Sequence, residues 1–188
     1  PLAQDGVSRE ATVFVADAAA LSPGDDVAVG WMISDAFIAA HDMTGTWQAF
    51  NGTWQPFFRR EVLSVDTATT PHTVTLDVPL RYPALVSDAA SLRLETGYIS
   101  EVGVEDLGFA NAVGWDEAWA NDRVHVLSLE YVKDAWVRNV ASFQSPIAPT
   151  SGNGADAHLQ NGGLQVHASK RVTVADTTME DAQDRGGG

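Results

Sequence analysis

Residues 102–109 read VGVEDLGF, residues 136–143 read WVRNVASF and residues 172–179 read VTVADTTM. The three stretches share one pattern, in which a central Val (Val104, Val137 or Val174) is followed two residues later by Asp or Asn. The Val predicts a strand with an inward face, and the Asp or Asn predicts a bend, because these residue types tolerate a left-handed backbone. The pattern therefore predicts short strands stacked as successive turns of a coil.

The spacing of the pattern predicts that loops interrupt the coil. Val137 lies 33 residues after Val104, and Val174 lies 37 residues after Val137. Both separations are longer than a minimal coil turn, so each turn must carry an insertion. Two loop-like segments supply the extra length: residues 111–122 and residues 144–163, the second rich in Pro, Gly, Ser and Asn.

These stretches look like the rungs of the pectate-lyase-like superfamily of right-handed parallel β-helices, over roughly residues 94–185. The resemblance implies an all-β fold, a right-handed parallel β-helix preceded by a small, largely antiparallel β subdomain. We expect the subdomain, with a Trp-rich insertion, over residues 1–90 and the β-helix over residues 91–188, with the coil continuing beyond Gly188. An ordinary Val-rich β-sandwich is the alternative fold for the same pattern.

The first 90 residues alternate strand and turn signals. Residues 12–15 and 27–31 are β-prone and flank turn residues, which predicts a hairpin-like pair, and Ser34-Asp35 offers an N-cap to a short helix over 36–41. Residues 61–65 and 73–78 flank a second turn. In the last of these strands one face is apolar, and we expect it to be buried: Val74, Leu76 and Val78.

Charge and composition exclude several classes of partner. The chain holds 25 acidic and 11 basic residues, a net charge of −14, which disfavours nucleic acid and anionic membrane surfaces as partners. There is no Cys, so thiolate chemistry and disulfides are excluded. No apolar run approaches the roughly 20 residues that cross a bilayer, so membrane insertion is not expected.

The most unusual local feature is an aromatic repeat. The segment Gly45-Thr46-Trp47-Gln48 recurs seven residues later as Gly52-Thr53-Trp54-Gln55, and each copy is followed by a Phe. Exposed aromatic faces stack on the apolar faces of sugar rings, and neighbouring amides bond hydroxyl groups. Trp47, Trp54 and Phe57 are therefore candidate saccharide-binding residues. The alternative is that these rings fill the core of the subdomain or plug the end of the β-helix.

The resemblance also implies polysaccharide lyase chemistry at the end of the coil. A lyase neutralises a uronate carboxylate, often with Ca²⁺, and removes a proton with a base. We expect His167, Lys170 and Arg185 in the catalytic roles, Arg171 as a substrate-binding residue, and Asp181 and Asp184 as ligands of a Ca²⁺ ion. A solvated turn with a local Asp–Arg pair is the alternative for the acidic residues.

The function predicted from these features is that of a secreted or cell-surface bacterial protein that acts on an anionic polysaccharide, as a lyase of the pectate-lyase-like kind. Glycoside hydrolysis is less well supported, because the Asn-Thr-Asp and Gly-His-Gly segments of β-helical polygalacturonases are absent. The rival is a noncatalytic surface or adhesin-type β-helix that binds saccharide. The oligomeric state stays open.

Overall fold

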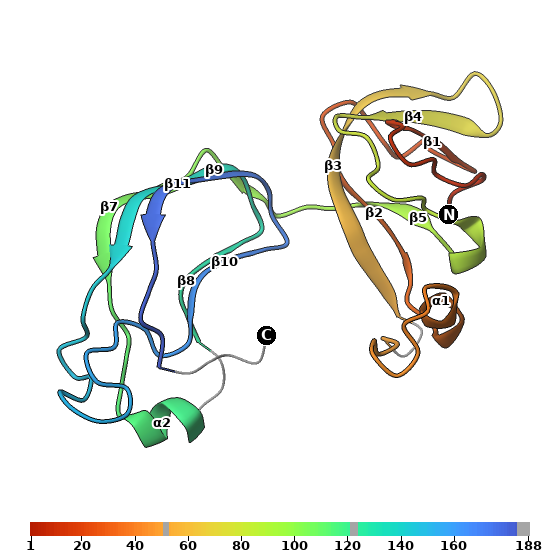
Figure 1. Cartoon of the computed structure of the whole chain (residues 1–188). Helices are drawn as coiled ribbons and strands as arrows, with labels where there is room; N and C mark the ends of the chain where they lie inside the picture. The colour runs from red at the N-terminus through yellow and green to blue at the C-terminus, as the bar shows by residue number, and fades with distance from the viewer. Residues whose placement is uncertain (51–52, 121–123, 184–188) are drawn as a thin grey trace. The chain divides into compact units, whose positions relative to one another are not determined.

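The computed structural model describes residues 1–50, 53–120 and 124–183. The chain divides into two compact units, Pro1–Thr96 and Gly97–Gly188. Strands are the main regular structure of each unit, with only short helices beside them, which confirms the predicted all-β class (Figure 1). No helix in the described ranges is long and apolar enough to span a membrane.

The first unit is a five-stranded antiparallel sheet with strand order β1-β4-β3-β2-β5. Its 13-residue strand β3 pairs with β2 at one end and with β4 at the other. The strands are β1 (Thr12–Val15), β2 (Asp26–Met32), β3 (Trp54–Asp66), β4 (His72–Leu76) and β5 (Ser91–Leu94), with helix α1 (Asp35–Ala40) between β2 and β3 and the 3₁₀ turn Val86–Asp88 before β5.

Some of the local predictions in this unit hold and others fail. The side chain of Ser34 caps α1 by accepting the N–H of Phe37, and β3 and β4 form the predicted antiparallel pair. The hairpin predicted for the first two strands is wrong, because β1 pairs with β4 and β2 pairs with β3 and β5. Val74 is fully buried as expected, whereas Val78 lies beyond the end of β4 and is exposed.

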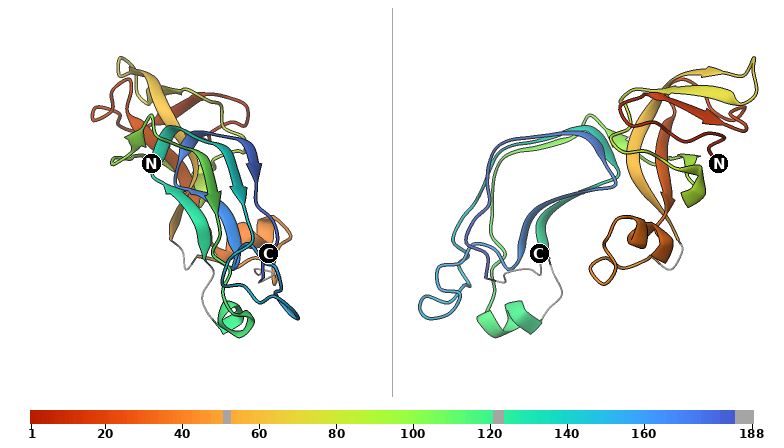
Figure 2. Two further views of the ribbon diagram at one scale, coloured as in Figure 1. Left: turned by 90° about the vertical axis from the view of Figure 1, so that its left-hand side faces the viewer. Right: turned by 45° about the vertical axis from the view of Figure 1, so that its right-hand side comes forward.

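The second unit is a coil of parallel strands. Strands β7, β9 and β11 lie side by side in one sheet, β6 extends the same sheet, and β8 pairs with β10 in a second sheet (Figure 2). The strands are β6 (Ile99–Ser100), β7 (Gly103–Phe109), β8 (His125–Glu130), β9 (Val132–Ser142), β10 (Gly162–His167) and β11 (Lys170–Thr178). Parallel strands joined by bends in this way form the predicted parallel β-helix.

The register of the coil matches the sequence pattern. Val137 is paired with Val104 on one side and with Val174 on the other. In the middle rung Val137 is completely buried, because neighbouring rungs cover it from both sides, whereas Val174 on the last rung is 47% exposed. Leu107, on the first rung, is exposed for the same reason.

The bends of the coil are stacks of residues in the left-handed backbone region. Asp106, Asn139 and Asp176 have φ of 58°, 50° and 51°, which confirms the predicted bend. The Asn139 side chain donates a hydrogen bond of 2.7 Å to the Asp106 carboxylate. A second stack, not predicted, has φ of 55°, 52° and 52° at Glu101, Asp134 and Arg171.

One outward-facing ring depends on a glycine. The indole of Trp136 lies over Gly103 of the neighbouring strand, where a Cβ would come within 2.1 Å of the ring. Gly103 therefore leaves the space that the indole occupies on the outer face of the sheet.

Between the rungs, the segment predicted as a loop over residues 111–122 contains a short helix, α2 (Trp115–Ala120). Its buried residue is Ala118. The segment predicted as a loop over residues 144–163 has no strand or helix up to residue 161, and its last two residues, Gly162 and Gly163, belong to β10. Asn111 and Ala112 both donate backbone hydrogen bonds to the carbonyl of His158, so the two insertions are joined by hydrogen bonds.

Candidate functional site

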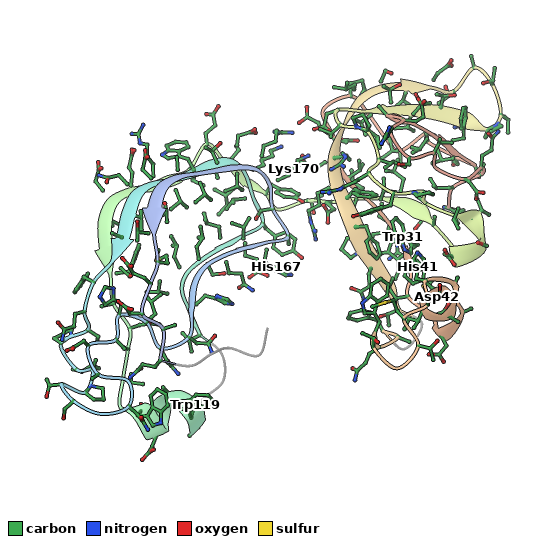
Figure 3. The ribbon with its side chains drawn as sticks, in the orientation of Figure 1. Trp31, His41, Asp42, Trp119, His167 and Lys170 are labelled. Atoms are coloured by element: carbon green, nitrogen blue, oxygen red, sulfur yellow. The ribbon has the colours of Figure 1, made fainter. Side chains whose placement is uncertain are left out.

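A cleft of about 850 Å³ opens on the first unit, where α1, the ends of β2 and β3 and the segment before β5 come together. Figure 3 labels two of its residues, Trp31 and His41, beside α1. Its walls are mainly aromatic and aliphatic: Trp31, Ile33, Phe37, His41, Thr46, Trp47, Gln48, Phe50, Gln55, Pro56, Phe57, Tyr82, Pro83, Leu85 and Asp88.

Two stacked rings form a rigid part of the wall. Trp31 on β2 and Phe57 on β3 stack with centroids 3.9 Å apart and planes 4° from parallel. Trp31 is buried in the core, whereas 40% of Phe57 is exposed. Because Phe57 rests on a buried partner, it presents an ordered aromatic surface to solvent.

The first copy of the aromatic repeat forms the opposite side. Trp47 follows α1 in a tight turn, in which its N–H donates to the carbonyl of Met43 over 2.9 Å. Its ring is 46% exposed. The His41 ring lies between Trp47, at 6.0 Å, and Phe37, at 4.2 Å. The cleft therefore holds a continuous row of rings from helix to loop.

The second copy of the repeat is divided between the two faces of β3. Gln55 and Phe57 line the cleft, and because side chains alternate along a strand, Trp54 points to the opposite face. There its ring fills the space over Gly30, and the guanidinium carbon of Arg93 lies 3.9 Å from the centre of the ring. The structure thus brings Trp47 and Phe57 together in the cleft and places Trp54 outside it.

A few polar groups interrupt the aromatic wall. The His41 Nδ1 donates to the carbonyl of Phe37 over 2.8 Å, which leaves Nε2 as the acceptor nitrogen of the neutral ring. Asp88, in the 3₁₀ turn, faces the same space. Burial raises the pKa of Asp88; the nearby Asp5 carboxylate also raises it, while His41 acts in the opposite direction. The Gln55 amide nitrogen donates to Thr53 over 3.1 Å.

The predicted catalytic and binding residues around the bend from β10 to β11, of which Figure 3 labels His167 and Lys170, have separate partners. His167 pairs with Glu130 at 2.9 Å, and Arg171 forms a bidentate pair with Asp134 through contacts of 2.5 and 2.9 Å. Lys170 is buried, with its ammonium 5.7 Å from the centre of the Tyr98 ring. Val166, the residue before His167, is exposed.

The predicted metal ligands fall at the end of the described chain. Asp181 contacts His158, with 3.5 Å between Oδ2 and Nε2, and His158 Nδ1 lies 2.9 Å from the hydroxyl of Ser142. Ser142 is buried and accepts the N–H of Glu180, so this network joins β9 to the two segments beyond it. Asp184 and Arg185 lie outside the described residues, and within those residues no group of three or more His, Asp or Glu side chains is arranged to hold a metal ion.

No protein-family model and no curated protein matches the chain. Among solved structures, the tailspike gp61 of Pseudomonas phage phi297 is similar, with a TM-score of 0.50 and 16% identity over 96% of this chain and 30% of that one. The gp54 tailspike of Acinetobacter baumannii bacteriophage AP22, solved with A. baumannii capsular saccharide, has a TM-score of 0.44 and 11% identity over 94% and 37% of the two chains. The chain spans about a third of these proteins, and the first match supports the β-helix fold.

Proposed function

We propose that this chain belongs to a protein that acts outside the cell and binds polysaccharide through the aromatic cleft of its first unit, without catalysis at that cleft. The observation that carries the proposal is the row of rings with exposed Trp47 and Phe57, set among Gln48, Gln55 and Asp88. Pyranose rings have apolar faces and polar edges, and they bind where an aromatic surface is bordered by a few hydrogen-bonding groups.

The size and order of the cleft fit this ligand. Its volume of about 850 Å³ lies within the range of small-molecule sites, and its open side allows a chain to enter and leave. The stacking of Phe57 on Trp31 fixes one aromatic surface before the ligand arrives. A surface that is already ordered loses little side-chain entropy on binding, so stacking contributes more of its energy to affinity.

The extracellular setting and the polysaccharide class draw support from the fold. A β-helix offers a long rigid frame, and the similar structure with a TM-score of 0.50 is a phage tailspike. Membership of the pectate-lyase-like superfamily remains our proposal for the second unit, on the strength of the three rungs.

Binding to an array of bacterial and plant polysaccharides tests the proposed function. We expect the Trp47→Ala and Phe57→Ala variants to bind about tenfold more weakly or worse, since each removes one stacking surface. Trp119→Ala is the matched control, because Trp119 is a partly exposed ring of α2 in the other unit. Equal binding by all three variants and the original chain would contradict the proposal.

A calcium-dependent polysaccharide lyase of the second unit is the other candidate. It is favoured by one observation, that His167, Lys170 and Arg171 lie at a single bend of the coil. In this scheme His167 or Lys170 removes the proton, Arg171 and Arg185 neutralise the uronate, and Asp181 and Asp184 hold Ca²⁺. The separate ion pairs of His167 and Arg171 would have to open first, which is why we prefer the binding function.

The lyase candidate has a direct assay. Cleavage of pectate, alginate or a glycosaminoglycan by elimination forms an unsaturated product that absorbs ultraviolet light. An absorbance increase that requires Ca²⁺ and disappears in Lys170→Ala would establish the lyase. A constant absorbance with every substrate, with and without Ca²⁺, would exclude it.

A further inference from the structure

We infer that the aromatic cleft selects a saccharide that presents hydroxyl or ammonium donors to its polar groups, and that it discriminates against uronates. The inference rests on the proposed function and names the class of ligand for the same site. It replaces the anionic polysaccharide expected from the sequence with a neutral or amino sugar.

The charged groups of the cleft carry the first part of the argument. Among the described residues that line it, none is Lys or Arg, and one, Asp88, is a carboxylate. Recognition of a carboxylate in a protein normally uses Arg or Lys, because their N–H groups carry the opposite charge. A uronate in this cleft would meet the like charge of Asp88 and no Lys or Arg of the wall.

The hydrogen-bonding groups carry the second part. The hydrogen bond from His41 Nδ1 to Phe37 leaves Nε2 as an acceptor in the neutral ring, and the Gln55 amide, which donates one N–H to Thr53, offers its oxygen as a second acceptor. With Asp88, three of the polar groups in the wall offer acceptors. Sugar hydroxyl groups and ammonium groups can donate to them, whereas a carboxylate can only accept.

The surroundings of Asp88 strengthen the argument. Asp88 is partly buried, and the carboxylate of Asp5 lies close enough to act on it, while Asp5 itself accepts the N–H of Val86 over 2.7 Å. Negative charge is thus already concentrated beside an apolar wall. A further anion would be repelled more strongly here than on an open surface, because an apolar wall screens charge less than water does.

Matched polysaccharides test the inference. We would measure binding of alginate, polygalacturonate and hyaluronan, each beside its carboxyl-reduced form, in which the uronate has become a neutral sugar. Chitin and chitosan oligosaccharides differ in acetylation of the amine, so only chitosan carries ammonium groups. Comparing their binding shows whether hydroxyl groups or ammonium groups donate to the cleft. Only binding that Trp47→Ala weakens at least about tenfold is assigned to the cleft.

The expected result is that neutral or amino saccharides bind through the cleft at least about tenfold more tightly than uronates. Asp88→Asn should narrow this difference, and Asp116→Asn, the same charge change in α2 of the other unit, should leave it unchanged. Uronates that bind through the cleft as tightly as their reduced forms would overturn this inference and leave the proposed function intact. If no saccharide binds in a way that depends on Trp47, both are overturned.

Discussion

The left-handed bend at Asn139 leads to a prediction whose sign is unusual for a strand. Asn139 has φ of 50° and donates one hydrogen bond to Asp106. Asn139→Ala loses that exposed hydrogen bond, about 0.5–1 kcal/mol, and keeps a Cβ, without the Asn side chain that tolerates it, in a region that costs L residues about 1–2 kcal/mol. Asn139→Gly loses the same bond without the steric cost. We therefore expect the Ala variant to be less stable than the Gly variant by about 1 kcal/mol.

The matched control is the residue before it. Arg138 is not among the positive-φ residues and its side chain is exposed, so Arg138→Gly should be less stable than Arg138→Ala by about 0.5–1 kcal/mol, the reverse order. Hydrogen exchange of peptides covering Val132–Ser142 reads the local stability of this strand in the whole chain. If Asn139→Ala protects β9 as well as Asn139→Gly does, the argument from the backbone is refuted.

Three further predictions concern single side chains. Gly103→Ala should displace the Trp136 indole and lower the free energy of unfolding by about 1–3 kcal/mol, seen as a lower urea midpoint and altered tryptophan fluorescence. Asp88→Asn should raise stability at pH 7 by about 0.5 kcal/mol after allowance for solvent screening, because a carboxylate whose folded pKa is raised destabilises the fold above that pKa; the gain should vanish below the ordinary value of 3.8. For Asp134, the hydrogen bond with Arg171 lowers the pKa, so its contribution of about 0.5 kcal/mol is present above the unfolded pKa and is lost as the pH falls through the folded pKa. Urea titrations of Asp134→Asn at pH 7 should show that loss, and a difference that persists at pH 2 would contradict it.

The coil was predictable because its core repeats. Val104, Val137 and Val174 lie in register since each must cover the next, and residues with that requirement share a type. The bend at Asp106 was readable for the same reason, as Asp and Asn tolerate the left-handed region. The second bend was not, because Glu101 and Arg171 hold the same backbone conformation and have no preference for it. There the stacked neighbours impose the conformation, and no local signal marks it.

The first unit was less predictable because its pairings are distant. Adjacent strands usually pair, which is why residues 12–15 and 27–31 suggest a hairpin, yet β1 pairs with β4 some 60 residues further along. The partner of an edge strand is decided by the packing of the hydrophobic core of the whole unit. Alternation along a short strand indicates that one face is buried, but it does not indicate which strand is the pairing partner.

For the candidate site, the sequence pointed to the exposed rings but not to their surroundings. Trp47 and Phe57 stood out because they belong to a repeat. Trp31 and Asp88 reach the cleft from β2 and from the turn before β5, and nothing in their sequence context links them to it. The repeat also gave no sign that Trp54 lies outside the cleft, because one copy lies in a loop and the other on a strand, where alternation sends neighbouring residues to opposite faces.

The unequal spacing of the rungs shows where this coil can change length. Paired residues of β7 and β9 are 33 residues apart in the sequence, and those of β9 and β11 are 37 apart. The pair β8 and β10 has the same offset of 37, so the bend between β8 and β9 is as long as the bend between β10 and β11. The difference therefore falls entirely in the segments that follow β7 and β9. The longer one contains an exposed tip at Gly152, which has φ of 78°. Added sequence at that tip would leave the strand register intact, which makes it the natural place for a reporter or an affinity label in this protein.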